Sequence, residues 1–153
     1  ATSTMVGQAL GAHQVRRAFR LFRLNVVLAM VAMGALGATF AVFPGFYLQW
    51  FQLDPDVYQI ATIMMLILGF EQVFIASGMT LTGGLRGAGE TLSPFVAQIF
   101  CVIGMRLGVG YILGFVFGLG ITGLYWATLL DWFARTIILA LAVKKGNWSR
   151  VKL

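Results

Sequence analysis

Charged side chains are scarce in this sequence. Of its 153 residues only 10% are Asp, Glu, Lys or Arg, whereas 59% are hydrophobic. Soluble globular domains carry about 25% charged residues, which cover a surface that faces water. The shortage of charge argues against a soluble domain and favours a protein that lies in lipid.

Cysteine and histidine are almost absent, with one residue of each type, Cys101 and His13. A single cysteine forms no intrachain disulfide and matches no metal-binding spacing. The sequence also lacks a Ser/His/Asp or Cys/His arrangement for nucleophilic catalysis. We therefore expect no enzyme, no metal site and no resident cofactor.

Acidic residues are fewer than basic ones, 5 against 11, and the net charge is +6. In a soluble protein such an excess would point to nucleic acid. Here the bases lie at the ends of apolar runs, which is typical of the flanks of membrane helices. The expected partner is the lipid bilayer and not nucleic acid.

Long apolar runs are abundant, and four of them reach the length of about 20 residues that a helix needs to cross a bilayer. They predict an all-α integral membrane protein, since alternating segments of about ten residues would be expected for a barrel. Pro44-Gly45 should kink or end the first span, and four glycines should form a close-packing face on the third: Gly104, Gly108, Gly110 and Gly114. The predicted spans are 25–49, 58–82, 94–117 and 121–143.

The residues before the first span predict two further pieces. Residues 1–12 resemble the end of a helix whose beginning is missing, so we expect a fragment of a longer chain. Residues 13–24 form a basic amphipathic connector, because apolar and basic side chains each recur at i, i+4 and i+7. The two stripes are Val15, Phe19, Phe22 and Arg16, Arg20, Arg23.

Lysine and arginine outside the spans fall on one side only. The loops 50–57 and 118–120 contain none. The positive-inside rule therefore places both ends and the 83–94 segment in the cytoplasm of a multi-pass protein of the cell (inner or plasma) membrane. The nine bases on that side are Arg16, Arg17, Arg20, Arg23, Arg86, Lys144, Lys145, Arg150 and Lys152.

Two glycine-rich segments predict turns. Residues 83–94 contain four glycines and a proline, so we expect the helix to break there, with Ser93 as N-cap and Pro94 at the first position of the next helix. The same segment looks like a phosphate loop, but no Lys-Ser/Thr pair follows. Gly118-Leu119-Gly120 predicts a second, tight turn.

Four ionisable residues lie inside the predicted spans: Glu71, Arg106, Asp131 and Arg135. A charge at the bilayer centre costs roughly 2.5–3.5 kcal/mol or more, so such residues usually have a partner and a function. Asp131 and Arg135 are four residues apart and should form an ion pair that locks helices together. The functional alternative for this pair is a proton or cation relay.

Glu71 has no basic residue in its own span, and two interpretations remain open. It pairs with Arg106 on the neighbouring helix, or it takes up a proton or a sodium ion and changes conformation when neutralised. Gln72 and Gln98 are candidates to line a substrate path, with helix–helix hydrogen bonding as the alternative.

Several motifs, in this order, resemble the C-terminal part of the multidrug and toxic compound extrusion (MATE) transporters. They are VGQALGA at 6–12, GLRGAGET at 84–91 with Pro94, Arg106, GLG at 118–120 with Gly123 and Trp126-Ala127, Asp131, Arg135 and GNW at 146–148. The resemblance covers nearly the whole chain.

The resemblance implies that the spans are helices 9 to 12 of a twelve-helix, two-lobe antiporter whose N-terminal lobe is missing here. Such a protein exports small organic, often cationic, compounds in exchange for sodium or protons by alternating access. The acid that several members carry in helix 10 would fall near Ile75, about one turn beyond Glu71. Two alternatives remain: a related lipid-linked oligosaccharide flippase, or a non-transporting helical fragment that needs a partner.

Overall fold

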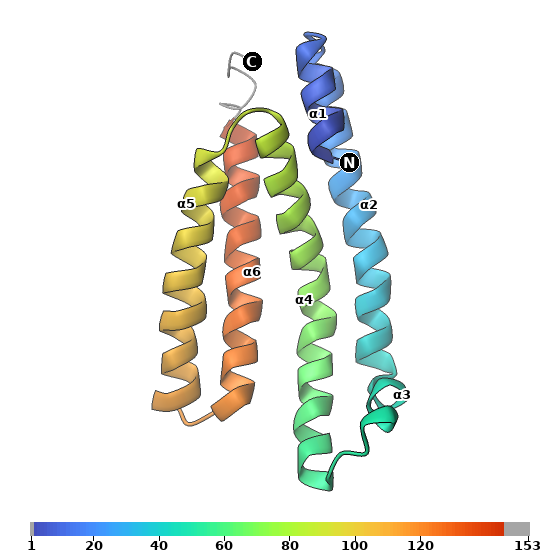
Figure 1. Cartoon of the computed structure of the whole chain (residues 1–153), viewed down its shortest axis with the longest axis vertical. Helices are drawn as coiled ribbons and strands as arrows, with labels where there is room; N and C mark the ends of the chain where they lie inside the picture. The colour runs from blue at the N-terminus through green and yellow to red at the C-terminus, as the bar shows by residue number, and fades with distance from the viewer. Residues whose placement is uncertain (1, 146–153) are drawn as a thin grey trace.

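The computed structural model describes residues 2–145, and the GNW motif predicted at 146–148 lies outside them. Four helical stretches run side by side and are long and apolar enough to cross a membrane (Figure 1). This confirms the predicted all-α membrane fold. The four are α2 (Val15–Val42), α4 (Pro55–Gly87), the continuous α5–η2–η3 stretch (Leu92–Val116) and α6 (Gly120–Lys145).

Shorter elements complete the described chain. Helix α1 (Thr2–Gly11) precedes α2, and α3 (Pro44–Leu48) and the 3₁₀ turn η1 (Gln49–Phe51) precede α4. The third stretch is α-helical over α5 (Leu92–Phe100) and π-helical over η2 (Cys101–Val109) and η3 (Ile112–Val116).

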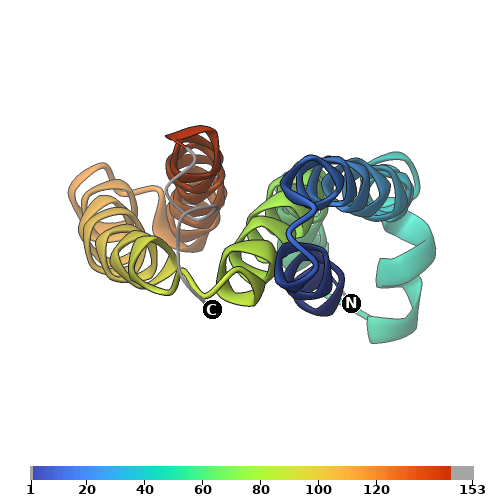
Figure 2. The same cartoon turned by 90° about the horizontal axis from the view of Figure 1, so that it is seen from above.

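Helix α4 is the centre of the arrangement. It packs against α1 and α2 on one side and against α6 on the other, and α6 in turn covers α5, η2 and η3. Seen from above, α4 stands between the α1–α2 pair and the pair formed by α6 and the third stretch (Figure 2). The helix therefore has two different interfaces, and the candidate site lies in the one with α6.

The first span differs from the prediction. A single helix runs from Val15 to Val42, instead of a connector over 13–24 followed by a span over 25–49. No proline and no glycine interrupts the sequence between Val15 and Met33, so the basic segment continues directly into the apolar one. The helix ends before Pro44, as expected, because the residue before a proline is pushed out of the helical region. The basic stripe is thus the first part of the membrane helix itself.

The break predicted for 83–94 is shorter than expected. Helix α4 continues through Gly83 and Gly84 to Gly87, and the chain turns only at Ala88–Thr91, where Gly89 has a φ of +81°. The glycines of the last turn serve close packing, since a Cβ on Gly84 would overlap the Phe22 ring of α2. A Cβ on Gly87 would overlap the backbone of α1 in the same way. Glycine's low helix propensity is offset here by the close approach of two neighbouring helices.

The start of α5 also corrects the prediction. Thr91 is the N-cap residue and Pro94 is the third residue of the helix rather than the first. The Ser93 backbone N–H donates to the Glu90 carboxylate at 3.1 Å, so Glu90 supplies the capping oxygen that Ser93 was expected to supply. A carboxylate suits this place because the first N–H groups of a helix have no partner within it.

The other glycine predictions had mixed outcomes. The turn at 118–120 is confirmed, with φ of +68° at Gly118 and +57° at Gly120. Gly110 and Gly114 do face Leu124 of α6, but a Cβ on Gly104 would meet no other described atom within 4 Å. In a π-helical segment, residues four apart no longer lie on one line, so the predicted four-glycine face is not formed.

Candidate functional site

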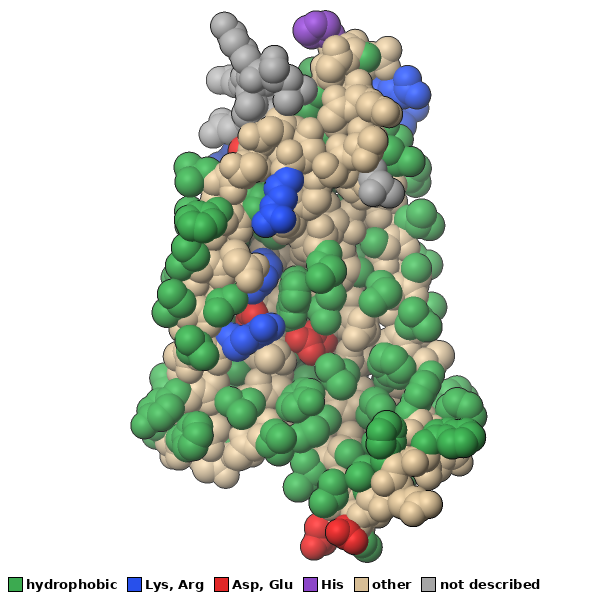
Figure 3. Space-filling view, viewed as in Figure 1, with side chains coloured by type: hydrophobic (Ala, Val, Ile, Leu, Met, Phe, Trp, Pro, Cys, Tyr) green, Lys and Arg blue, Asp and Glu red, His purple; other side chains and the backbone are tan. Residues whose placement is uncertain are grey.

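Buried polar side chains concentrate in the interior between α4, α6 and the third stretch. Within the described residues, the buried polar or charged side chains are Glu71, Ser77, Asp131 and Arg135. Figure 3 shows acidic and basic side chains together about half-way along a face that is otherwise largely hydrophobic. Because buried charges are costly, this cluster is the candidate functional site.

Helix α6 positions the cluster through a regular spacing. Its buried residues recur at every fourth position, along one line of the helix: Gly123, Ala127, Asp131, Arg135 and Leu139. Gly123 allows close contact with the backbone of Leu113 in η3. The two charged members are therefore held on the same buried line as the packing residues, facing the third stretch.

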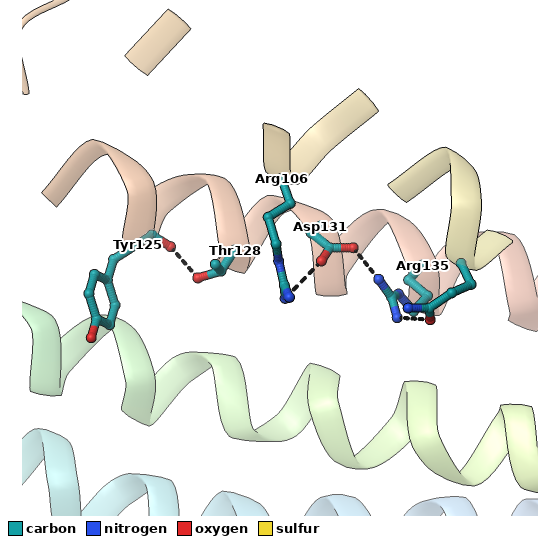
Figure 4. Close-up of polar contacts among 6 residues, drawn as sticks. Arg106, Tyr125, Thr128, Asp131 and Arg135 are labelled. Carbon is teal, nitrogen blue, oxygen red and sulfur yellow. Dashed lines mark hydrogen bonds and ion pairs between the residues drawn. The ribbon is translucent and has the colours of Figure 1, made fainter. Parts of the chain in front are cut away.

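Asp131 is the centre of the cluster and is fully buried. One carboxylate oxygen pairs with Arg135 at 2.7 Å and the other with Arg106 of η2 at 2.9 Å (Figure 4). The predicted i, i+4 ion pair is thus confirmed, and a second arginine joins it from the neighbouring stretch. The two arginines offset part of the cost of burying the Asp131 carboxylate.

Arg135 has two further partners. It donates a hydrogen bond to the side-chain oxygen of Gln98 in α5, and its guanidinium lies 4.6 Å from the centre of the Trp132 ring. Gln98 was predicted as a substrate-lining candidate, and the structure instead brings it into the charge cluster. Helices α5 and α6 are therefore joined by a polar contact inside the membrane-spanning region.

Arg106 is the accessible member of the cluster. Its side chain is 41% exposed, whereas that of Asp131 is fully buried. It reaches past Asp131 toward α4 in Figure 4. The contact is ionic rather than a well-aligned hydrogen bond, so both Asp131 Oδ2 and Arg106 Nε make no hydrogen bond in the described structure. A π-helical segment carries Arg106, and such segments occur frequently at functional sites.

Glu71 lies on the face of α4 that packs against α6 and is 3% exposed. Its carboxyl group lies beside the side chain of Thr128 and feels the charges of Arg106 and Asp131. The ion pair between Glu71 and Arg106, one of the two interpretations left open for Glu71, is not formed: both ion pairs found within the described residues use Asp131. Asp131, and not Glu71, is the ion-pair partner of Arg106.

Gln72 points elsewhere. It is one residue beyond Glu71, so it faces α2, where its Cβ lies beside Gly37. The structure therefore does not bring this substrate-lining candidate to the cluster. Ile75, where the resemblance places an acid, is apolar, which leaves Glu71 as the acid of α4 that faces the cluster.

Threonine and serine residues at the same interface escaped the sequence analysis. Thr128 contacts Glu71, and Ser77 of α4 bonds Thr136 of α6 at 3.1 Å. Thr136 also donates to the Phe74 carbonyl oxygen at 3.1 Å. The spacing of Thr128, Trp132 and Thr136 at i, i+4 and i+8 is the signal that would have found this line on α6.

An apolar groove of about 440 Å³ lies between α4 and α6. Its volume is within the range of small-molecule pockets. It is lined by Ile63, Leu66, Ile67, Phe70, Phe74, Trp126 and Leu129. The lining residues belong to the same two helices as Glu71 and Thr128, but the groove itself is apolar.

Comparison with known proteins gives one family. The family model MatE matches residues 1–112, a range that includes Glu71 and Arg106 but not α6. A relative among curated proteins is the probable multidrug resistance protein NorM of Thermotoga maritima, with 29% identity over 109 residues. The match covers 71% of this chain and 24% of that relative, so the chain spans about a quarter of its length. No solved structure matches.

Proposed function

The chain belongs to the MatE family of membrane transporters, and on this premise we propose that the whole protein is a secondary antiporter. It exports organic, often cationic, compounds in exchange for sodium ions or protons. The chain supplies helices 9 to 12 of a twelve-helix transporter, within its C-terminal lobe. The other lobe comes from the rest of the protein, and transport follows from movement of the lobes about a central site.

The observation that carries this proposal is the buried cluster around Asp131 with Glu71 beside it. Arg106 and Arg135 bring two positive charges and Asp131 one negative charge. Ionised Glu71 makes the cluster neutral, and protonated or sodium-bound Glu71 leaves one positive charge. Because net charge in a membrane is costly, occupancy of Glu71 changes which arrangement of the helices is favoured. This assigns the coupling role to Glu71 and an organising role to Arg106, Asp131 and Arg135.

Thr128 is a hydrogen-bond partner for the ionised form of Glu71. Its hydroxyl donates to the Tyr125 carbonyl oxygen at 2.8 Å, and a hydroxyl has only one proton to donate. On ionisation Glu71 must accept, so the Thr128 hydroxyl would turn from Tyr125 toward Glu71.

The substrate side of the proposal rests on the apolar groove between α4 and α6. Aromatic side chains are suited to organic cations, since the ring faces attract positive charge. Phe70, Phe74 and Trp126 line this groove. Gln98 contributes by holding Arg135, whereas Gln72 belongs to the packing between α2 and α4.

We further propose that the described ends of the chain face the cytoplasm of the cell membrane. The α1–α2 turn, the α4–α5 turn and the end of α6 lie at one end of the bundle, and the two loops without lysine or arginine lie at the other (Figure 1). An excess of basic residues marks the cytoplasmic side.

The experiment uses the full-length protein expressed in cells that are loaded with ethidium. We expect lower dye retention than in cells with an empty vector, and loss of the difference when the driving gradient is collapsed. A protonophore and a sodium ionophore, applied separately, identify the coupling ion. Unchanged retention with the protein present in the membrane would contradict the efflux proposal.

A further inference from the structure

The basic end of α2 carries a feature that the transport cluster does not use. Phe19, Arg23 and Val27 follow one another at i, i+4 and i+8, so they form a ridge along the helix. These three residues line two grooves, one on each side of the ridge. Arg23 is therefore a positive charge shared by two apolar grooves.

Both grooves are mainly apolar, but different helices line them. The first measures about 520 Å³ and continues along α2 itself, where Arg20 and Leu24 complete it. The second measures about 300 Å³ and lies between α2 and α6, over Leu81 of α4. Lys144 stands at the basic end of the second groove, which is completed by Phe22, Val26, Ala140 and Val143.

The depth of Arg23 follows from the length of the helix. The nineteen residues from Leu24 to Val42 contain no charge and extend about 28 Å at about 1.5 Å per residue. The hydrocarbon core of a bilayer is about 30 Å thick. Once this segment fills the core, Arg23 lies at the level of the lipid headgroups, and both grooves begin there.

We propose that this ridge binds an anionic two-chain phospholipid. Its phosphate contacts Arg23, with Arg20 and Lys144 on either side, and one acyl chain lies in each groove. Basic pockets between membrane helices are known places for anionic headgroups, and the three cations supply the complementary charge. The apolar lining of the grooves favours a lipid over a free phosphate, because a free phosphate would leave that lining without a partner.

The test measures lipid binding to the full-length protein in detergent by native mass spectrometry. Phosphatidylglycerol and phosphatidylcholine with the same acyl chains are titrated separately. Wild type should bind phosphatidylglycerol more tightly, and Arg23→Gln should weaken this binding about fivefold, the factor expected for one arginine at an anionic headgroup. Arg23→Gln should leave phosphatidylcholine binding unchanged.

Arg17→Gln is the matched control. Arg17 is an exposed arginine of the same helix, but it lines neither groove and bonds Gln14 instead. The substitution removes the same charge as Arg23→Gln, but at a position outside both grooves. Phosphatidylglycerol binding should therefore change less than about twofold. Equal losses in Arg17→Gln and Arg23→Gln would mean a diffuse attraction to the basic end and would overturn the site.

Two competitors separate the possible ligands. Lysophosphatidylglycerol, with one acyl chain, should bind more weakly than phosphatidylglycerol, because it fills one groove only. Inorganic phosphate should not compete with the lipid. Equal binding of the one-chain lipid would refute the ridge with two grooves, and effective competition by phosphate would refute the lipid.

Discussion

The two faces of α4 are built in opposite ways. Toward α2 the contact depends on glycine, since a Cβ on Gly37 would overlap the Gly69 carbonyl oxygen and a Cβ on Gly69 would overlap that of Gly37. Toward α6 the contact depends on polar groups, with Glu71 beside Thr128 and Ser77 bonded to Thr136. The first face permits one tight arrangement, whereas the second contains donors and acceptors that can exchange partners. If the proposed antiport function holds, we expect α1, α2 and α4 to move as one body and ion coupling to act between α4 and α6.

The largest effect is expected when a charge is removed from the cluster around Asp131. Asp131→Asn leaves Arg135 buried without its charged partner, and breaking a buried ion pair in this way costs about 3–5 kcal/mol. We expect a clear fall in thermal stability of the full-length protein in detergent. An additional Arg135→Gln substitution should recover part of the loss. A stability of Asp131→Asn equal to wild type would show that Asp131 does not hold the helices together.

The glycine face is tested by adding a single methyl group. Gly37→Ala places a Cβ against the backbone of α4, which cannot move aside as a side chain can, and we expect a loss of about 1–3 kcal/mol in stability. Gly104→Ala is the matched control, since its Cβ has open space around it. That change should leave the stability equal or raise it by up to about 1 kcal/mol, because alanine favours helix over glycine. Similar melting temperatures for both variants would contradict the close α2–α4 contact.

A substitution at Glu71 should impair ion coupling without disturbing helix packing. Glu71→Gln keeps the shape of the side chain but can neither release a proton nor bind sodium as a carboxylate does. We expect ion-driven dye export to fall at least about tenfold, which corresponds to about 1.4 kcal/mol, with little change in melting temperature. Asp131→Asn that reaches the membrane should keep more of its ion dependence than Glu71→Gln. Equal transport and equal pH dependence in Glu71→Gln and wild type would remove Glu71 from the site.

Thr128 gives the smallest expected effect. Thr128→Val removes the hydroxyl that contacts Glu71, and one hydrogen bond is worth about 1 kcal/mol, or about a fivefold change in an equilibrium. We expect a shift of this size in the ion concentration that gives half-maximal export. Thr128→Ser keeps the hydroxyl and should resemble wild type. A shift in Thr128→Ser as large as in Thr128→Val would assign the effect to packing instead.

Several local features of the sequence were predicted correctly, although the N-cap of α5 was not. The pair Asp131 and Arg135 needs only one helix, because residues four apart lie on the same face. The turn at Gly118 and Gly120 likewise depends on neighbouring residues that adopt positive φ. Apolar runs long enough for a bilayer led to the helical membrane fold without any knowledge of its packing.

Features that join distant parts of the chain were missed. The helical course of Gly84 depends on Phe22, which is 62 residues away, so helix propensity alone pointed to a break that occurs only at 88–91. The partner of Arg106 depended on whether Asp131 or Glu71 was nearer once the helices had packed. Gln98 and Gln72 could not be told apart until each was assigned to a neighbouring helix.

The sequence by itself determined the solvent, the number of long apolar helices and the residues that carry charge within them, because hydrophobicity and helical spacing are properties of adjacent residues. Only the tertiary structure decided which charges pair, which glycines are contact points and which face of α4 contains Glu71. Those outcomes depend on the distances between side chains on different helices, and these distances are set when the helices pack together.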